Sequence, residues 1–401
     1  METVKGVPFF TQAQEKLNQY PYLDKNLECE ILIIGAGIDG SIANYYLSKN
    51  HDVVLVDKSK IGFGCTSCAT ALLEYQLDEF ASDLLPYLTE NEIVQIYQMG
   101  IDSVQKIKEF VKKHGNKCHF FERPTFLYTE SSLSSAPVIE EFNFRRKNGF
   151  NCELITENNN PFPFKVSAGI FCENGGCEFN PYLFTKQMIE NSKNQNHIFE
   201  NTKIEKLTKN QDGTFIASTN FGNEIKCEKI ILATGFNWEV IDENNLCERF
   251  VSYSIVTNPV NINYFKNSLV HNTKSPYNYM RTLPDGRIIF GGEDLPFNEK
   301  KGITQKDAEK KYASLEKSLK QLFPENANKI SISNKFCGLF GTTKNNLGLI
   351  GESKTKNLFY FISCGANGII NAMFGVELLE DLFSGRQNEL ASQFSPLRED
   401  L

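Results

Sequence analysis

Two cysteines separated by two residues are the first side chains in this 401-residue sequence whose spacing could do chemistry. Cys65 and Cys68 stand in the stretch IGFGCTSCATALLEYQLD, which holds the chain's single Cys-x-x-Cys. This spacing is typical of a redox dithiol or of half a metal site. A metal site would need more ligands, and the five histidines show no ligand spacing. We therefore predict no bound metal, and the dithiol interpretation stays open.

A glycine-rich turn precedes the cysteines. Gly35, Gly37 and Gly40 stand between an apolar run and a helical pattern in CEILIIGAGIDGSIANYYLSKNHDVVLVDKS, and a second apolar run ends at Asp57. In such units the first glycine forms the turn, the second lets the backbone approach a pyrophosphate, and the third lets helix and strand pack closely. The acid binds ribose hydroxyls. Strand, helix, strand and acid in this register predict a dinucleotide site.

Two later segments return the chain to this site. CEKIILATGFNWEV is an apolar run that ends in Ala233, Thr234 and Gly235, and CGANGIINAMFGVELLEDLFSG opens a helical pattern at Gly365 and Gly368. The N–H groups at a helix start attract anions. A second helix start near the C-terminus favours one extended cofactor that both ends of the sequence contact.

The order of these motifs resembles the FAD-dependent D-amino-acid oxidase superfamily, which includes glycine oxidase, sarcosine oxidase and γ-glutamylputrescine oxidase. The resemblance covers nearly the whole chain and depends on four motifs in order: GFGCTSCATALLEYQLD, YNYMRTLPDGRIIFGGED, GLFGTTKNNLGLIGE and GANGI. Within the superfamily, these motifs are most similar to those of a bacterial branch without a settled substrate. The resemblance implies FAD, with its pyrophosphate at Gly35–Gly40, its ribose at Asp57, its adenine at the Ile204 backbone and its pyrimidine ring at Gly365–Ile369. The residues that it assigns to FAD are Gly35, Ala36, Gly37, Ile38, Asp39, Gly40, Asp57, Lys58, Gly64, Cys65, Thr66, Ser67, Thr70, Ala71, Leu72, Ile204, Ala233, Thr234, Gly235, Gly341, Gly365, Ala366, Asn367, Gly368 and Ile369.

The same resemblance changes the interpretation of the two cysteines. In the family, the loop after the ribose acid runs along the pyrophosphate to the flavin, so Cys65 and Cys68 would be small lining residues beside the hydroxyls of Thr66 and Ser67. Flavin disulfide reductases also carry a cysteine pair after their first dinucleotide unit. They need a second fingerprint for NAD(P)H, however, and the sequence contains none. Dithiol chemistry is therefore the less favoured alternative.

The linkage of FAD follows from the same resemblance. Sarcosine oxidases attach FAD through a cysteine in the region of Cys337, but Gly338 stands at the linking position here. We expect non-covalent FAD.

The residue expected to bind the substrate carboxylate differs from that of the amino-acid oxidases. In glycine oxidase and D-amino-acid oxidase, an arginine in the stretch corresponding to GLFGTTK holds the substrate carboxylate, and Phe340 stands at that position here. An aromatic ring cannot replace a bidentate guanidinium. Arg281, with Tyr279 beside it, is predicted to hold a polar or anionic substrate end. The alternative is that Arg281 forms an ion pair with Asp285 or Glu293.

Strands and helices must position these side chains. FVSYSIVTNPV and NYMRTLPDGRIIFGGED are predicted to form strands that cover the flavin. Tyr253, in the first of them, is predicted to close the substrate pocket, with a core position as the alternative. Helices are predicted over 91–115 and 305–322, where apolar residues recur with a helical period.

The fold class predicted from these elements is α/β, α+β overall. A discontinuous FAD-binding Rossmann-like domain is expected at 1–80, 165–245 and 330–401, with an inserted mixed-sheet substrate domain at 81–164 and 246–329. The hydrophobic fraction of 41% is sufficient for a core of that size.

Net charge and hydropathy disfavour several classes of protein. The net charge is −7, and the lysine-rich stretches also contain acids, which disfavours nucleic-acid binding. No apolar run approaches the length of a membrane span, and the first residues lack a signal-peptide pattern. We predict a cytoplasmic protein without a membrane span, in which the eleven cysteines are mostly reduced.

The predicted function is that of an FAD-dependent oxidoreductase. It would oxidise the C–N bond of a small-molecule amine or amino acid by hydride transfer to flavin N5, with oxygen or another electron carrier as acceptor. The alternative is an FAD-dependent dehydrogenase of a hydroxy acid or polyol. A flavin-dithiol oxidoreductase using Cys65 and Cys68, or a non-enzymatic flavin-binding protein, is less favoured.

Overall fold

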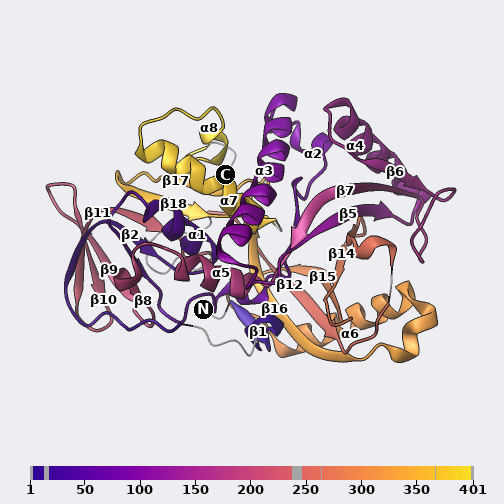
Figure 1. Ribbon diagram of the computed structural model, residues 1–401, viewed down its shortest axis with the longest axis horizontal. Helices are drawn as coiled ribbons and strands as arrows, with labels where there is room; N and C mark the ends of the chain where they lie inside the picture. The colour runs from indigo at the N-terminus through magenta and orange to yellow at the C-terminus, as the bar shows by residue number, and fades with distance from the viewer. Residues whose placement is uncertain (1–2, 13–17, 237–245, 263, 366, 399–401) are drawn as a thin grey trace.

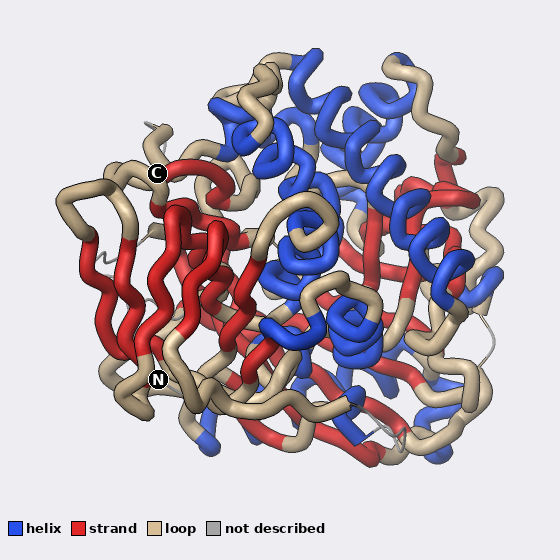
Figure 2. The backbone as a smooth tube through the Cα atoms, turned by 60° about the vertical axis from the view of Figure 1, so that its left-hand side comes forward, coloured by secondary structure: helices blue, strands red, loops and turns tan. Residues whose placement is uncertain are grey.

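The computed structural model describes residues 3–12, 18–236, 246–262, 264–365 and 367–398. Two large sheets contain most of its strands, and helices pack over both of them (Figures 1 and 2). The glycine turn belongs to the smaller sheet, and the FVSYSIVTNPV strand to the larger one.

The eight-stranded sheet has the order β17-β18-β11-β2-β3-β8, with β10 paired to β11 and β9 to β10. Its central pairs, β2 with β3 and with β11, are parallel. Their side chains form continuous apolar runs because both faces of a parallel sheet are covered. The bounds are β2 (Leu27–Ile34), β3 (Val53–Val56), β8 (Ile198–Phe199), β9 (Ile204–Lys209), β10 (Phe215–Thr219), β11 (Glu224–Leu232), β17 (Leu349–Glu352) and β18 (Leu358–Ile362).

The ten-stranded sheet has the order β1-β16-β12-β15-β14-β13-β5-β7-β4, with β6 paired to β7. Its neighbours are antiparallel except β13 and β5, which run parallel. The bounds are β1 (Val4–Gly6), β4 (Leu72–Glu74), β5 (Phe121–Thr129), β6 (Glu153–Thr156), β7 (Ala168–Glu178), β12 (Glu248–Thr257), β13 (Leu269–Asn272), β14 (Asn278–Thr282), β15 (Ile288–Pro296) and β16 (Ile332–Thr342).

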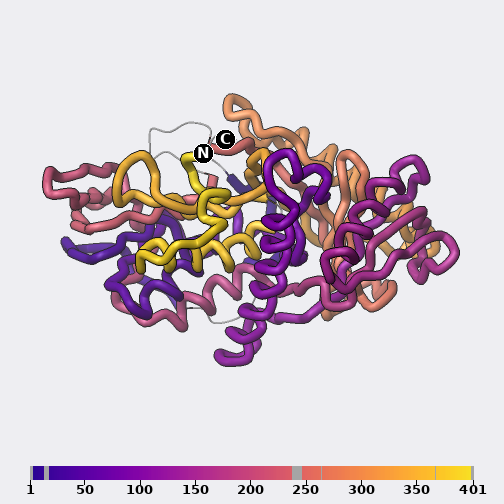
Figure 3. The backbone as a smooth tube through the Cα atoms, turned by 90° about the horizontal axis from the view of Figure 1, so that it is seen from above, coloured from indigo at the N-terminus to yellow at the C-terminus, as the bar shows by residue number. Residues whose placement is uncertain are grey.

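The helices pack over both sheets. α1 (Ile38–Leu47) packs on α5 (Pro181–Glu190) and on α7 (Gly368–Phe383) beside the eight-stranded sheet, and α6 (Gln305–Leu322) packs on β12 and β15. α3 (Glu90–His114) crosses between the two halves of the molecule (Figure 3). The remaining α-helices are α2 (Ala81–Leu84), α4 (Ser135–Lys147) and α8 (Ala391–Phe394). The 3₁₀ helices are η1 (Phe9–Gln12), η2 (Cys65–Cys68), η3 (Ser132–Ser134), η4 (Gln195–His197), η5 (Phe265–Asn267) and η6 (Pro324–Lys329).

Both predicted helices are present, and their ends have local causes. Thr89 and Glu92 form a capping box at the start of α3, and Gly115 ends it with a φ of 86°. Thr304 caps α6 by accepting from the Asp307 N–H. The boundaries at 91–115 and 305–322 therefore follow from sequence signals.

The predicted mixed α/β fold is confirmed, and the domain boundaries stay a prediction. Sheet membership does not follow those boundaries everywhere, because β4, β7 and β16 lie within the ranges predicted for the cofactor domain but pair in the ten-stranded sheet. Among the described residues, no helix combines the length and the apolar character needed to cross a bilayer.

Candidate functional site

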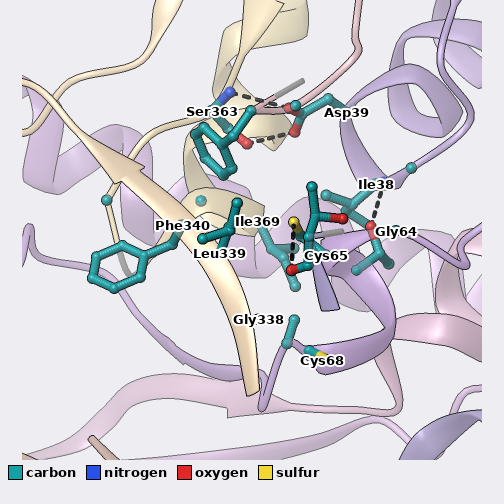
Figure 4. A pocket seen from close by; sticks show the side chains of 18 of the residues that line it. Ile38, Asp39, Gly64, Cys65, Cys68, Gly338, Leu339, Phe340, Ser363 and Ile369 are labelled. Atoms are coloured by element: carbon teal, nitrogen blue, oxygen red, sulfur yellow. Dashed lines mark hydrogen bonds between the residues drawn. The ribbon is translucent and has the colours of Figure 1, made fainter. Parts of the chain in front are cut away.

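A cavity of about 340 Å³ lies between the two sheets. The carboxyl ends of β2, β3 and β11 and the start of α7 contribute residues from one half of the molecule. The strands β4, β12, β13, β14 and β16 contribute residues from the other half. Figure 4 shows three of them, Gly338, Leu339 and Phe340 of β16. Crevices at the carboxyl ends of parallel strands are common ligand sites.

The glycine turn at the end of β2 shapes one wall. Gly35 has a φ of +106°, and a Cβ there would overlap the Ala233 carbonyl. A Cβ on Gly40 would overlap the carbonyl oxygen of Gly35, which explains the close approach of helix and turn. A Cβ on Gly37, in contrast, would meet only Thr66 Oγ1 at 3.2 Å. The turn is therefore closed on the protein side and open on the cavity side.

The start of α1 faces this opening. Among the described side chains, none caps the helix at Gly37, although the Ile38 N–H donates to Thr66 Oγ1 at 2.9 Å. At the end of β3, Asp57 accepts hydrogen bonds from the Ala36 N–H at 2.7 Å and the Ser59 N–H at 2.8 Å. These bonds fix the carboxylate at the cavity edge, where a hydroxyl-rich ligand could reach it.

The start of α7 forms the opposite wall. Gly365 has a φ of +82°, and Gly368 and Ile369 line the cavity. The Asn367 side chain accepts from the Glu74 N–H at 3.1 Å and donates to the Gln76 carbonyl at 2.9 Å. Asn367 thus holds the segment after β4 against a helix start whose positive end faces the cavity.

Four strands of the larger sheet form the floor. Their register places His271 opposite Tyr279, Tyr279 opposite Gly291, and Gly291 opposite Ser254. The Tyr279 hydroxyl lies 3.3 Å from Ser252 Oγ and 3.2 Å from Ser254 Oγ. A Cβ on Gly291 would overlap the Tyr279 ring, so this glycine makes room for it.

A histidine and a carboxylate meet beside this floor. His271 Nε2 lies 3.2 Å from Glu74 Oε2. Burial opposes protonation of His271, but Glu74 and then Asp78 outweigh burial and raise the pKa of the imidazole above its usual value. The site therefore contains a titratable base next to the cavity.

Most residues that the sequence assigned to the cofactor line this single cavity. They are Gly35, Gly37, Ile38, Asp39, Asp57, Lys58, Gly64, Cys65, Thr66, Thr70, Ala71, Leu72, Ile204, Ala233, Thr234, Gly235, Gly365, Asn367, Gly368 and Ile369.

Four others do not line it, and Ala366 lies outside the described residues. Gly40 and Gly341 are packing positions, because a Cβ on either would overlap a neighbour. Ala36 donates its N–H to Asp57, and Ser67 Oγ donates to the Gly64 carbonyl at 2.8 Å. These residues support the wall without forming its surface.

Arg281 does not line the cavity, which corrects the prediction that it contacts substrate. Its side chain is 1% exposed, with Nη1 3.5 Å from Glu178 Oε2 and Nη2 donating to the Phe179 carbonyl at 2.9 Å. The structural alternative holds, but with a different partner. Asp285 pairs with Arg287, and Glu293 with Lys311.

Tyr253 is also corrected, because its side chain is buried in the core and contacts the ring of Tyr312 on α6. Side chains alternate along a strand, so Ser252 and Ser254 face the cavity while Tyr253 faces α6.

Tyr279 and Phe340 do line the cavity. The Phe340 ring stacks on Phe250 with centroids 5.7 Å apart, and it points away from Cys65 and Ile369 (Figure 4).

Several lining residues escaped the sequence prediction. Ser252 and Ser254 could have been found from the strand alternation of VSYSIV. Glu74 and His271 carried no local signal, because they come from strands nearly 200 residues apart in the sequence and their side chains meet only in the folded protein.

The sulfur atoms of Cys65 and Cys68, the two thiols of η2, lie near backbone carbonyl groups. Cys65 Sγ is 4.0 Å from the Thr3 carbonyl, and Cys68 Sγ is 3.4 Å from the Cys337 carbonyl. Burial raises the pKa of Cys65 to about 11 and that of Cys68 well above its usual value. Thiolates are thus disfavoured at neutral pH. No disulfide joins the eleven cysteines, all of which are described.

Asp39 is a buried acid at the start of α1. It accepts a hydrogen bond from the Ser363 N–H at 3.1 Å and another from the Ser363 hydroxyl (Figure 4). Burial raises the pKa of Asp39 to about 7 despite both bonds. Between about pH 4 and pH 7 the unfolded chain therefore loses this proton while the folded protein retains it, so stability falls as pH rises.

Asp39→Asn removes this titration. The free energy of unfolding of the variant minus that of wild type is expected to increase by about 2 kcal/mol between pH 5 and pH 8, because only wild type loses stability as the pH rises. Urea denaturation measures this difference. A difference that stays constant across that range would contradict the burial argument.

Comparisons with known proteins agree with this arrangement. The sequence profile described as FAD dependent oxidoreductase (DAO) matches residues 30–382. A curated relative from Bacillus subtilis (strain 168), whose name describes a Rieske 2Fe-2S iron-sulfur protein YhfW, is 25% identical over 182 residues. That match covers 45% of this chain and 35% of the relative, so the chain spans about a third of the relative's length.

Solved structures share the fold over nearly the whole chain. A glycine oxidase from Geobacillus kaustophilus has a TM-score of 0.76 at 16% identity, covering 93% of this chain and 100% of that chain. An L-proline dehydrogenase from P. horikoshii has a TM-score of 0.74 at 18% identity, covering 92% and 97%. An L-amino acid deaminase from Proteus vulgaris has a TM-score of 0.75 at 16% identity, covering 95% and 99%. Because the family profile spans most of the chain, the protein belongs to the DAO family and is an FAD-dependent oxidoreductase.

Proposed function

We propose that this oxidoreductase oxidises the C–N bond of a small amine or amino acid. The observation that supports this most is the single cavity in which the open glycine turn, Asp57 and the α7 start face the His271–Tyr279 floor. One cavity of this kind can place a reacting carbon against a cofactor ring and exclude water from both.

The residues present fit FAD. The start of α1, where Gly37 provides no N-cap side chain, and the open side of Gly37 suit a pyrophosphate, and the Asp57 carboxylate suits ribose hydroxyls. Ile204 would contact adenine, and the helix start at Gly365–Ile369 would face the pyrimidine ring. When bound, FAD supplies the two-electron acceptor that takes hydride at N5 from the carbon bearing nitrogen.

The chain's own residues then have three tasks. Tyr279, fixed by Ser252 and Ser254, orients the substrate. His271 accepts the N–H proton that an ammonium must lose, since only a neutral amine nitrogen has a lone pair for the forming C=N bond. The positive end of α7 stabilises negative charge that develops beside it.

The structural neighbours support this chemistry by their names, which include glycine oxidase, L-proline dehydrogenase and iminodiacetate oxidase. The curated relative's name supports testing an iron–sulfur carrier beside oxygen as electron acceptor.

Anaerobic titration of the FAD-loaded protein tests the proposal. Panels of amines, amino acids, hydroxy acids and polyols are added, and loss of the yellow flavin absorbance is followed. We expect bleaching by at least one amine or amino acid. Bleaching by a hydroxy acid or polyol alone would overturn C–N oxidation in favour of C–OH oxidation. Reoxidation by oxygen or by a ferredoxin-type carrier then identifies the acceptor.

The pH dependence of turnover should report His271. We expect kcat to rise with pH through the raised pKa of His271, as the neutral imidazole forms. Glu74→Gln removes the carboxylate that raises this pKa, so the midpoint should move to lower pH, as measured at saturating substrate. A midpoint that Glu74→Gln leaves unmoved would contradict the assignment.

Replacing both Cys65 and Cys68 with serine should leave flavin reduction within about twofold of wild type. Their raised pKa values keep them protonated, and a protonated thiol is a poor nucleophile. Rapid-reaction measurements of flavin bleaching check this. Loss of turnover with FAD still bound would restore the dithiol alternative.

A further inference from the structure

Acidic side chains collect at the end of the cavity that faces the ten-stranded sheet. Glu74 and Asp78 line it from β4 and the segment that follows. The two lysines of the described lining, Lys58 and Lys203, are at the other end, next to Asp57 and the start of β9. Asp39 and Asp57 also lie at the nucleotide end, so acids line both ends, but among the described lining residues the lysines lie only at the nucleotide end.

Glu74 is held rigidly at this end. Its carboxylate accepts from the Gln76 side chain and lies 3.2 Å from His271 Nε2, and its N–H donates to Asn367. A protonated His271 offsets the charge of Glu74, whereas a neutral His271 does not.

Among the described residues that line the cavity, no arginine offers a guanidinium partner to a substrate carboxylate. Arg281 is bound to Glu178 and Phe179, and Arg145 is buried with its Nε 2.7 Å from Glu141 Oε1. An anion placed beside Glu74 and Asp78 would meet like charges, and this repulsion is unfavourable.

A cation would find favourable contacts in the same place. The rings of Tyr277 and Tyr279 both line the cavity, with centroids 6.0 Å apart. Aromatic faces attract ammonium groups, most strongly where water is excluded. We propose that the substrate is an organic ammonium cation without an α-carboxylate, attracted by Asp78 and the Glu74–His271 pair and bound next to the tyrosine pair. This inference rests on the proposed C–N oxidation and narrows its substrate class.

Binding of two ligands tests the charge preference without turnover. The FAD-loaded protein is titrated calorimetrically with tetramethylammonium chloride and with sodium acetate. We expect tetramethylammonium to bind at least about 10-fold more tightly than acetate. Asp78→Asn should weaken tetramethylammonium binding by about 10-fold. The control is Glu79→Gln, because Glu79 is exposed, accepts from Asn346 at 3.4 Å and does not line the cavity.

Matched substrates extend the test to reduction. 1,4-Diaminobutane and ornithine differ by one α-carboxylate, and N-methylbutylamine and N-methylnorvaline form a second such pair. Faster flavin bleaching by the amine of either pair supports the inference. Equal or faster bleaching by the amino acid, tighter binding of acetate, or equal effects of the Asp78 and Glu79 variants would overturn it. If nothing reduces the flavin while tetramethylammonium binds in an Asp78-dependent way, C–N oxidation fails and the cation site stands.

Discussion

Replacing Gly37 with valine is expected to weaken FAD binding strongly while the chain still folds. Gly37 has φ −72° and ψ −166°, which valine adopts readily, and the nearest atom to an added Cβ is Thr66 Oγ1 at 3.2 Å. The two added methyl groups would instead enter the cavity over the α1 start. Overpacking of this size costs about 1–3 kcal/mol, or about 10- to 100-fold in FAD affinity.

The measurement is FAD titration of the apoprotein, followed by flavin fluorescence. Gly37→Ala should give an intermediate loss, because its single methyl group projects less far. Ser218→Val on β10 is the matched control, since it adds a β-branched side chain to a half-buried strand position away from the cavity. Wild-type affinity in Gly37→Val, with an unchanged unfolding midpoint of the apoprotein, would show that the pyrophosphate lies elsewhere.

Arg281→Met is expected to destabilise the fold by about 3–5 kcal/mol. Glu178 is 1% exposed, and removing Arg281 leaves its carboxylate with Arg123, whose Nη2 lies 3.0 Å from Glu178 Oε1. Loss of one partner from a buried ion pair has an effect of this size, because the other charge stays buried and poorly compensated. The Phe179 carbonyl would also lose its donor. Urea denaturation measures the change.

A matched control is available on the same hairpin. Arg287 pairs with Asp285 at 2.9 Å, but both side chains are partly exposed. Arg287→Met should therefore cost less than about 1 kcal/mol. If Arg281 held substrate, Arg281→Met would instead raise KM at unchanged stability. Glu178→Gln combined with Arg281→Met should be less harmful than the sum of the single changes, because neither charge then remains alone.

Much of the cofactor half could be predicted from sequence because its determinants are local. The glycine spacing, the apolar runs around it and Asp57 lie within one continuous segment, and each residue type has a backbone reason to be there. The same holds for α7, whose start is marked by Gly365 and Gly368. Local signals of this kind survive folding because the element that carries them folds as a unit.

The substrate half could not be predicted in the same way. Arg281 and Tyr279 lie two positions apart on β14 and share a face, yet Tyr279 reaches the cavity while Arg281 ends against Glu178. The prediction that Tyr253 closes the pocket overlooked strand alternation. Side chains alternate along β12, so Ser252 and Ser254 face the cavity and Tyr253 faces the other side.

The sequence by itself predicted the residues that line the glycine-turn end of the cavity and the mixed α/β fold, because short segments determine glycine turns, buried strands and helix starts. Only the tertiary structure decided the charge of the substrate end. Glu74 lies 3.2 Å from His271 although β5 and β7 stand between β4 and β13 in the strand order, and Arg281 is turned from the cavity because β7 places Glu178 beside it. Charge complementarity depends on distances across the sheet, and no spacing along the chain encodes those distances.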